Sequence, residues 1–221
     1  MCSFRIDKDS LGDVKVPSDA YYGPFTARAD NQYKATGHQA HINLIRSYIM
    51  IKRSAALANK ELNVLSANTA DAIVKTCDEI LNGKLLNQFL VEAINSGAGT
   101  AFNMNVNEVI ANRALEILGK KKGEYKIISP NDHVNMSQST AMHIAIILNT
   151  LQTVSAIDKL IYSLQRKAGE FEDIIKIGRT HLMDAIPVTL GDEFDEYAFS
   201  LKKAREGLIQ SMEHLKFIGL G

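Results

Sequence analysis

The hydrophobic and polar positions of the chain follow a helical period over most of its length. Three stretches carry apolar residues every three or four positions: residues 42–62, 67–81 and 104–118. Such spacing places the apolar side chains on one face and predicts an amphipathic helix in each stretch. Lys52, Arg53 and Lys60 lie between the apolar residues of the first helix and supply its polar side.

Two longer apolar stripes follow in the second half of the chain. The first consists of Ile144, Ile147, Leu148, Leu151, Val154, Ile157, Ile161 and Leu164, and the second of Phe194, Tyr197, Leu201, Ala204, Leu208, Met212, Leu215 and Ile218. The first predicts a helix roughly 40 Å long at 1.5 Å per residue, and the second predicts an antiparallel partner for it. Two such helices leave apolar surface uncovered, so we expect association with other chains.

The first 36 residues have a different character. Glycine and proline interrupt them at Gly12, Pro17, Gly23 and Pro24, which is too often for a long helix. We therefore expect irregular structure with short extended pieces, and a small hairpin fits around residues 13–16.

Together these patterns predict a mainly α-helical fold with two parts. Residues 1–138 would form an N-terminal α domain with short extended or hairpin pieces. Residues 139–221 would form the first two long antiparallel helices of a central helical bundle, which two helices leave incomplete.

Composition excludes several classes of function. The chain has 25 basic and 25 acidic residues, so no global field attracts nucleic acid or an anionic membrane, and we expect neither as a partner. Cys2 and Cys77 belong to no Cys-x-x-Cys or Cys/His cluster, which argues against a disulfide framework and a zinc site and fits a reducing cytoplasm. No signal peptide is evident, and we expect no segment with the ~20 apolar residues that span a bilayer.

Residues 130–140 form a polar stretch directly ahead of an apolar run. Ser137, Ser139 and Thr140 therefore lie where a helix should begin. A helix start presents unpaired N–H groups and the positive end of the helix dipole, and hydroxyl groups add neutral donors, so this position suits a carboxylate or a phosphate. The alternative is that Ser137 or Ser139 is only an N-cap.

Residues 95–108 form a second unusual stretch. Its two glycines let the backbone approach a ligand closely, and Thr100 sits just ahead of a predicted helix. Asn103, Asn105 and Asn107 are poor helix formers at alternate positions. They either serve a binding site or form a buried asparagine ladder that fixes the loop, and both interpretations require partners for their amides.

Residues 178–191 form the third unusual stretch. A glycine at each end and a proline inside predict a loop, in which Thr180 and His181 place a hydroxyl beside an imidazole. Histidine titrates near neutrality and can hold a leaving amine or a water by hydrogen bonding or proton transfer. A purely structural histidine is the alternative.

Three polar loops at the ends of long helices resemble the active-site segments of the aspartase/fumarase superfamily. The similar motifs are Ser96-Gly97-Ala98-Gly99-Thr100, Pro130-Asn131-Asp132-His133-Val134-Asn135 with Ser137-Gln138-Ser139-Thr140, Gly178-Arg179-Thr180-His181, and Asp19-Ala20-Tyr21-Tyr22-Gly23. The likeness covers nearly the whole chain. It is closer to aspartases than to class II fumarases, which usually carry tryptophan before the glycine of the last motif and histidine in place of Ser129.

The resemblance implies a carbon–nitrogen lyase that converts L-aspartate to fumarate and ammonia through a dianionic aci-carboxylate. Thr100, Ser139 and Thr140 would bind the carboxylate next to the acidic carbon. Thr180 would hold the other carboxylate, and His181 with Thr100 would contact the leaving amino group. This chemistry needs no metal cofactor. Intact members of the superfamily are homotetramers, so the implied partners are a small dicarboxylate and further copies of the chain.

Two departures from the superfamily pattern qualify this assignment. An Asn-Asp-x-x-Pro-Thr block normally follows Gln-Ser-Thr, whereas Thr140 is followed at once by Ala141-Met142. The catalytic base of the family is a serine on a Gly-Ser-Ser-x-x-x-Pro-x-Lys-x-Asn loop, which has no match in the 221 residues. We therefore expect an amino-terminal part of such a lyase that is inactive alone. The alternatives are a class II fumarate hydratase and a non-catalytic paralogue that binds a dicarboxylate or co-assembles with an intact lyase.

Overall fold

The computed structural model describes residues 3–217 except residues 33, 93, 96–98 and 141. These residues form two compact units, of which the first runs to Ile146 and the second spans residues 147–217. Helices dominate both units, and the two sheets are small antiparallel hairpins, so the predicted mainly α-helical fold is confirmed. The domain boundary expected after residue 138 stays a prediction.

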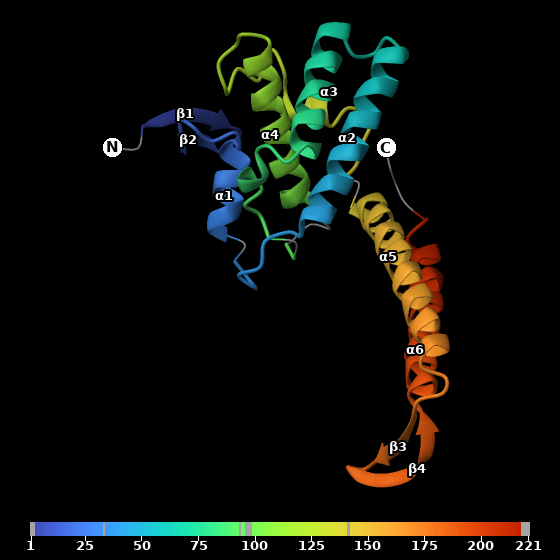
Figure 1. Ribbon diagram of the computed structural model, residues 1–221. Helices are drawn as coiled ribbons and strands as arrows, with labels where there is room; N and C mark the ends of the chain where they lie inside the picture. Colours follow the sequence, from blue (N-terminus) through green and yellow to red (C-terminus); the bar gives the residue numbers. More distant parts are fainter. Residues whose placement is uncertain (1–2, 33, 93, 96–98, 141, 218–221) are drawn as a thin grey trace. The chain divides into compact units, whose positions relative to one another are not determined.

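The first unit contains two strands followed by helices and short helical turns (Figure 1). In chain order its elements are β1 (Phe4–Asp9), β2 (Gly12–Pro17), α1 (Pro24–Gln32), α2 (Ile42–Glu61), α3 (Ala67–Leu81), the 3₁₀ turn η1 (Leu86–Gln88), α4 (Thr100–Ile117) and the π-helical turn η2 (Pro130–Val134). Helix α3 packs against α2 and α4, and α4 also packs against α1.

The amino-terminal segment is more ordered than its glycines and prolines suggested. Strands β1 and β2 pair from Phe4 opposite Pro17 to Asp9 opposite Gly12, so the expected hairpin exists and is longer than expected. The expectation of otherwise irregular structure is wrong, because the nine residues of α1 follow it. Pro24 occupies the first position of α1, where the missing N–H costs nothing.

A carboxylate from another helix caps α1. The side chain of Glu108 on α4 accepts hydrogen bonds from the backbone N–H groups of Gly23, Phe25 and Thr26 at 2.9, 2.9 and 3.0 Å. These donors belong to the start of α1 and have no partner within the helix. Glu108 therefore fixes where α1 begins, which a local sequence pattern cannot show.

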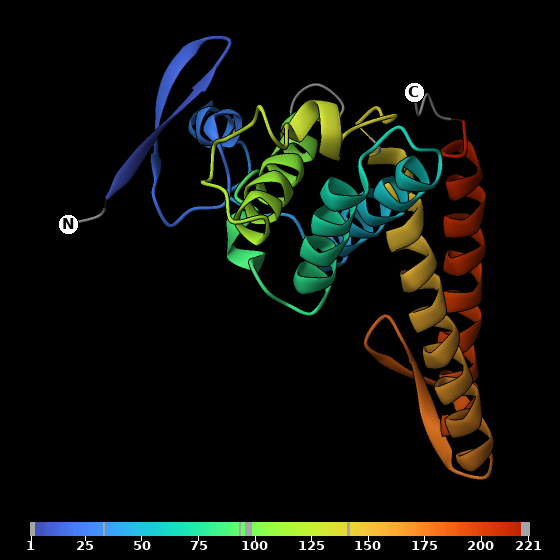
Figure 2. The ribbon, with the colours of Figure 1, turned by 90° about the horizontal axis from the view of Figure 1, so that it is seen from above.

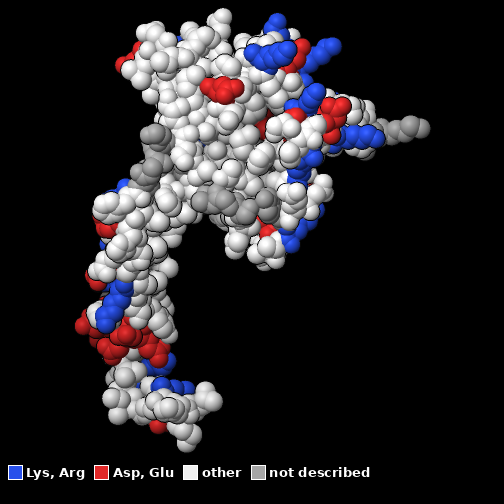
Figure 3. Space-filling model, turned by 180° about the vertical axis from the view of Figure 1, so that it is seen from behind, with Lys and Arg blue, Asp and Glu red and all other residues white. Residues whose placement is uncertain are grey.

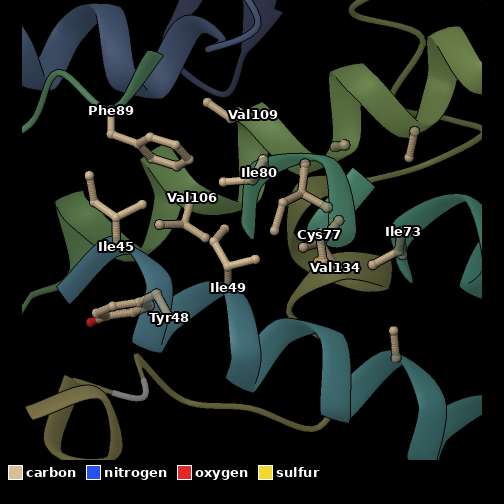
Figure 4. Close-up of a cluster of buried hydrophobic side chains, with 14 of the residues drawn as sticks. Ile45, Tyr48, Ile49, Ile73, Cys77, Ile80, Phe89, Val106, Val109 and Val134 are labelled. Carbon is tan, nitrogen blue, oxygen red and sulfur yellow. The ribbon is translucent and has the colours of Figure 1, made fainter. Parts of the chain in front are cut away.

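The predicted helices α2, α3 and α4 are confirmed. Helix α3 has the predicted bounds, α2 ends one residue earlier, and α4 begins four residues earlier, at Thr100. Their shared core is drawn in Figure 4, where Ile45 and Ile49 of α2 lie beside Val106 of α4. Tyr48 and Phe102 add an edge-to-face ring contact at 5.1 Å between centroids.

The asparagines of α4 are buried, and their side-chain amide nitrogens have partners. Asn105 donates to the carbonyl of Gln88 at 3.0 Å and accepts from the N–H of Val91 at 3.3 Å. Asn103 and Asn107 both donate to the side chain of Asn135, at 3.1 and 3.3 Å. The asparagine-ladder interpretation is therefore confirmed, because these contacts fix the segments before and after α4.

The second unit consists mainly of two long antiparallel helices joined by a β-hairpin (Figure 2). Its elements are α5 (Met142–Glu170), whose first five residues belong to the first unit, β3 (Ile175–Thr180), β4 (Met183–Thr189) and α6 (Leu190–His214). Arg205 of α6 pairs with Asp158 of α5 at 2.5 Å, and Phe171 meets Phe194 at 5.2 Å between ring centroids. The predicted pair of long antiparallel helices is confirmed.

Strands β3 and β4 overturn the prediction of a loop at residues 178–191. They pair antiparallel from Ile175 opposite Thr189 to Thr180 opposite Met183, with a register shift between Ile177 and Arg179. β-Branched residues, three in each strand, favour this extended structure. Proline was taken as a sign of a loop, but a two-stranded hairpin has edges that tolerate it.

Helix α5 also contradicts the expectation that no segment reaches the length of a membrane span. It has 29 residues, and an 18-residue window in it has a mean hydropathy of 1.4, with 17% of that window buried. Length and composition of one helix are weak evidence, since a helix packed among other helices has the same properties. Asn149, Gln152 and Thr153 also interrupt the apolar residues of α5, as in an amphipathic helix.

Replacing Glu108 by glutamine is expected to destabilise the protein by about 2 kcal/mol, because hydrogen bonds to a charged acceptor are stronger than those to an amide. Urea unfolding followed by circular dichroism measures the change. Glu61→Gln is the control, since Glu61 is exposed on α2. Equal midpoints for the two variants would mean that the Glu108 carboxyl is not the charged cap of α1.

Candidate functional site

Two helix starts that carry predicted site residues touch each other in the first unit. Thr100 is the first residue of α4, and Thr140 precedes the start of α5 at Met142 by two residues. Gly99 lies against the Met142 side chain so closely that a β-carbon on Gly99 would overlap it. The structure therefore brings the start of α4, with Thr100, against the start of α5, which Ser139 and Thr140 precede in the chain; this contact is called the corner below.

This corner has the chemical character that anion binding requires. Each helix start presents backbone N–H groups and the positive end of a helix dipole. Thr100 and Ser139 are exposed and Thr140 is half-buried, so a ligand can reach all three. Among the described residues, no group of three or more His, Cys, Asp or Glu could hold a metal ion. The groups at this corner are hydrogen-bond donors.

A cavity of about 580 Å³ adjoins Thr100, within the usual size range of ligand pockets. It is lined by Lys8, Asp9, Ser10, Pro24, Phe25, Thr100, Met104, Glu108, Tyr125, Ser129, Pro130 and Asn131. The β1–β2 turn, the start of α1, one face of α4 and the start of η2 therefore surround it. Of its acidic residues, Asp9 pairs with Arg28 at 2.8 Å and Glu108 caps α1.

Glu108 and Tyr125 are ionisable groups of this cavity whose pKa values burial raises. Burial raises the pKa of the Glu108 carboxyl, while the backbone and side-chain hydrogen bonds from α1 oppose this shift. Burial also raises the pKa of Tyr125, so its hydroxyl keeps its proton. Because three N–H groups occupy the oxygens of Glu108, we assign it a structural role rather than that of a general base.

Ser129 supports η2 at the other side of the cavity. Its hydroxyl oxygen accepts from the N–H groups of Asn131 and Asp132 at 3.3 and 3.0 Å, as an N-cap does. Its own N–H donates to Nδ1 of His133 at 2.9 Å. The serine therefore caps the start of the π-helical turn, and the three hydrogen bonds fix the polar stretch locally.

A buried hydrogen-bond network also holds the polar stretch of residues 130–140. The Asn135 side-chain oxygen accepts from the Lys52 ammonium at 2.7 Å as well as from Asn103 and Asn107, and its amide nitrogen donates to the Gln138 carbonyl at 2.8 Å. Lys52 is fully buried on α2. Burial lowers its pKa to about 7, and no salt bridge of the described residues includes it.

Helix α2 makes a second attachment two turns further on. Asn59 donates to the carbonyl of Met136 at 3.1 Å and accepts from the hydroxyl of Ser137 at 3.3 Å. Ser137 therefore serves this attachment and is not the N-cap of α5. The backbone of Ser137 has a φ of +59°, a left-handed conformation that these side-chain contacts stabilise.

Thr180 and His181 lie in the second unit, at the end of the β3–β4 hairpin. His181 and Leu182 form a two-residue turn with φ values of +50° and +63°, and Arg179 pairs with Asp184 across it at 3.5 Å. Both Thr180 and His181 are exposed. The five predicted site residues are thus divided, three in the first unit and two in the second, and their convergence stays a prediction.

Sequence reasoning missed the part that α2 plays in this site. It placed Lys52 on the polar side of the helix, which is wrong, because Lys52 is fully buried. The signal was present in the spacing of Ile45, Ile49, Lys52 and Ala56, which puts the lysine on the apolar face. A lysine at such a position needs a polar partner, and the side-chain oxygen of Asn135 is that partner.

Replacing Gly99 by alanine should disturb the corner in two ways. A left-handed φ of +87° costs an alanine about 1–2 kcal/mol, and the overlap with Met142 adds about 1–3 kcal/mol. Gly83→Ala is the matched control, since Gly83 has a φ of +93° and nothing near its missing β-carbon. Chemical unfolding of both variants measures the difference. Equal losses of stability would contradict the contact between the two helix starts.

Comparison with known proteins agrees with this arrangement of motifs. An aspartate ammonia-lyase of a Bacillus species is 46% identical over 223 residues, which cover 98% of this chain and 48% of that protein. A class II fumarate hydratase of Helicobacter pylori (strain ATCC 700392 / 26695) is 42% identical over 225 residues, covering 99% and 49%. The crystal structure of a fumarate lyase:delta crystallin from Brucella melitensis bound to cobalt has a TM-score of 0.80 and 43% identity, covering 96% and 48%.

The chain spans about half the length of the curated relatives it matches. Residues 12–221 match the family model described as Lyase, which is almost the whole chain. The chain therefore belongs to this lyase family of the aspartase/fumarase superfamily and corresponds to an amino-terminal part of its members.

Proposed function

We propose that the chain contributes the amino-terminal part of an aspartate ammonia-lyase, which converts L-aspartate to fumarate and ammonia. The observation that carries this proposal is the contact between Gly99 and Met142, which joins the helix start that carries Thr100 to the helix start that Ser139 and Thr140 precede in the chain. The identity of 46% to an aspartate ammonia-lyase supports it. An anion-binding corner suits a substrate with two carboxylates.

The reaction removes a proton from Cβ of L-aspartate. The electron pair of the broken C–H bond moves into the neighbouring carboxylate, which becomes a dianionic aci-carboxylate. When this intermediate collapses, the pair forms the Cα=Cβ bond and the C–N pair leaves with the amino group as ammonia. Because charge grows on one carboxylate, preorganised hydrogen-bond donors around it lower the barrier.

The proposed roles are those that the resemblance to the superfamily implies. Thr100, Ser139 and Thr140 surround the carboxylate that gains charge, where their hydroxyls and the N–H groups of the helix starts donate hydrogen bonds. Thr180 holds the other carboxylate and His181 contacts the amino group, both from the second unit. The 221 residues contain no match to the serine loop of the family, so the proton-abstracting base comes from other polypeptide.

A class II fumarate hydratase is the second candidate, because one such enzyme is 42% identical to the chain. That reaction uses the same carbanion chemistry with water in place of ammonia. Ser129 argues for the lyase of aspartate, since it stands where fumarases commonly carry histidine and is used here to cap η2. The two candidates differ in the group on Cα, which is an amine or a hydroxyl.

Ligand-linked thermal stability tests the proposal on the chain itself. Succinate, an unreactive four-carbon dicarboxylate, should stabilise the protein by about 2.7 kcal/mol at 100 times its dissociation constant. L-Aspartate is expected to raise the melting temperature more than L-malate at equal concentration, and the reverse order favours the hydratase. Thr100→Val should abolish the shift, and Thr153→Val, on the exposed side of α5, should leave it intact. The absence of any shift would reject a dicarboxylate site.

We also propose that the chain associates with further copies of itself through the second unit. Much of the visible surface of that unit carries no charged side chain (Figure 3). Large apolar side chains on it are at least 47% exposed, namely Leu151, Leu160, Tyr162, Ile174, Ile175, Ile177, Leu182, Met183, Ile186, Tyr197, Phe199 and Phe217. So much exposed apolar surface is typical of an interface.

Light scattering coupled to size-exclusion chromatography should give a mass of at least twice the 24.4 kDa of one chain. Leu160→Lys places a charge among the exposed apolar residues of α5 and should shift the population toward smaller species. Gln165→Lys, at an exposed polar position of the same helix, is the control. A wild-type protein that elutes as a monomer at every concentration would contradict self-association.

A further inference from the structure

Lys52 is a fully buried lysine that the proposed chemistry does not use. It lies in the middle of α2, its side chain is 0% exposed, and its ammonium donates to the side-chain oxygen of Asn135 at 2.7 Å. Burial of a cation without a counter-charge is costly, so an apolar residue would fit this part of the core at lower cost. A lysine at this position therefore needs a functional or structural reason.

We propose that Lys52 is a positioning residue that acts through Asn135 to fix residues 135–140, and with them the hydroxyls of Ser139 and Thr140. The importance of Ser139 and Thr140 rests on the proposed function. The attachment of the segment to α2 does not, since it follows from the contacts alone.

Asn135 is the point at which three helical segments meet. Its side-chain oxygen faces the ammonium of Lys52 on α2 and the amide nitrogens of Asn103 and Asn107 on α4. Its amide nitrogen must then face the other way, where it donates to the carbonyl of Gln138. The orientation of this amide is unambiguous, because an ammonium group can only donate. One side chain thereby connects α2 and α4 to the polar stretch ahead of α5.

The composition of the network suits a cationic donor. The side-chain oxygens of Asn103, Asn107 and Gln138 are buried and have no hydrogen-bond partner among the described residues. Lysine brings three N–H groups and no acceptor, and an apolar side chain would bring neither. Removing the lysine would leave a further buried oxygen with weaker partners.

The neighbouring contacts show that side chains on one face of α2 bind residues from Asn135 to Met142 at several points. Tyr48 precedes Lys52 by one turn and donates from its hydroxyl to the sulfur of Met142 at 3.5 Å, while Asn59 follows by two turns and holds Met136 and Ser137. Positions four and seven residues apart lie on the same face of a helix. Lys52 is the central attachment of the three.

Lys52→Met is the decisive variant, because methionine has nearly the same length and shape but no donor. The readout is hydrogen exchange at Asn135, Met136 and Gln138, whose N–H groups donate to backbone carbonyls and are therefore protected. Ile49→Val is the matched control, since it truncates a buried residue of the same helix without removing a hydrogen-bond donor. The expected result is at least tenfold faster exchange at the three amides in Lys52→Met, beyond any change elsewhere in the first unit.

A uniform rise in exchange across the first unit, equal in both variants, would overturn the proposal, because a merely structural lysine destabilises the whole core. A second measurement uses the wild-type protein and so does not depend on whether the variant folds. The side-chain amide resonances of Asn135 should follow the deprotonation of Lys52, with a midpoint at about pH 7. Cys77 on α3 is the titratable neighbour whose charge acts on Lys52, and burial raises its pKa to about 12, well outside this range.

The proposal would also be overturned if the chemical shifts of the Asn135 side-chain amide stayed constant while Lys52 titrates, whatever the midpoint of that titration. Succinate binding then separates it from the proposed function. We expect at least tenfold weaker binding by Lys52→Met and unchanged binding by Ile49→Val. If the wild-type protein does not bind succinate, the proposed function fails, while the exchange and resonance data still decide the role of Lys52.

Discussion

The structure of the first unit depends on buried polar side chains that find partners on other segments. The oxygen of Asn135 joins α2 and α4, and the carboxylate of Glu108 joins α4 to the start of α1. Such contacts are strong only while every member is satisfied, because an unpaired polar group in a core costs several times what a hydrogen bond contributes. They also connect residues far apart in the chain, so they determine which loops lie together.

The sequence was informative where a pattern is local. Periodic apolar residues predicted α2, α3, α5 and α6 within a few residues at most of their ends. The polar segments around Thr100 and Thr140 were identified from composition and from their resemblance to a known family, and the structure places both at helix starts.

What could not be predicted is decided by tertiary contact. Nothing within α1 shows that Glu108, from a helix more than 70 residues later, satisfies its first N–H groups. Lys52 was assigned to the polar side of α2 because lysine is normally exposed, and only Asn135 explains its burial. The strands around Thr180 were taken for a loop because local glycine and proline were given more weight than β-branched residues.

The two long helices have a consequence for how the protein behaves in solution. Within the second unit α5 and α6 bury few large side chains, among them Val154, Ile161 and Met212, and leave most of their apolar residues in contact with water. Little of the free energy that holds this unit together is therefore generated inside one chain. A partner that covered the remaining surface would add to the folding free energy of this unit, and dilution of that partner would then weaken the unit as a denaturant does.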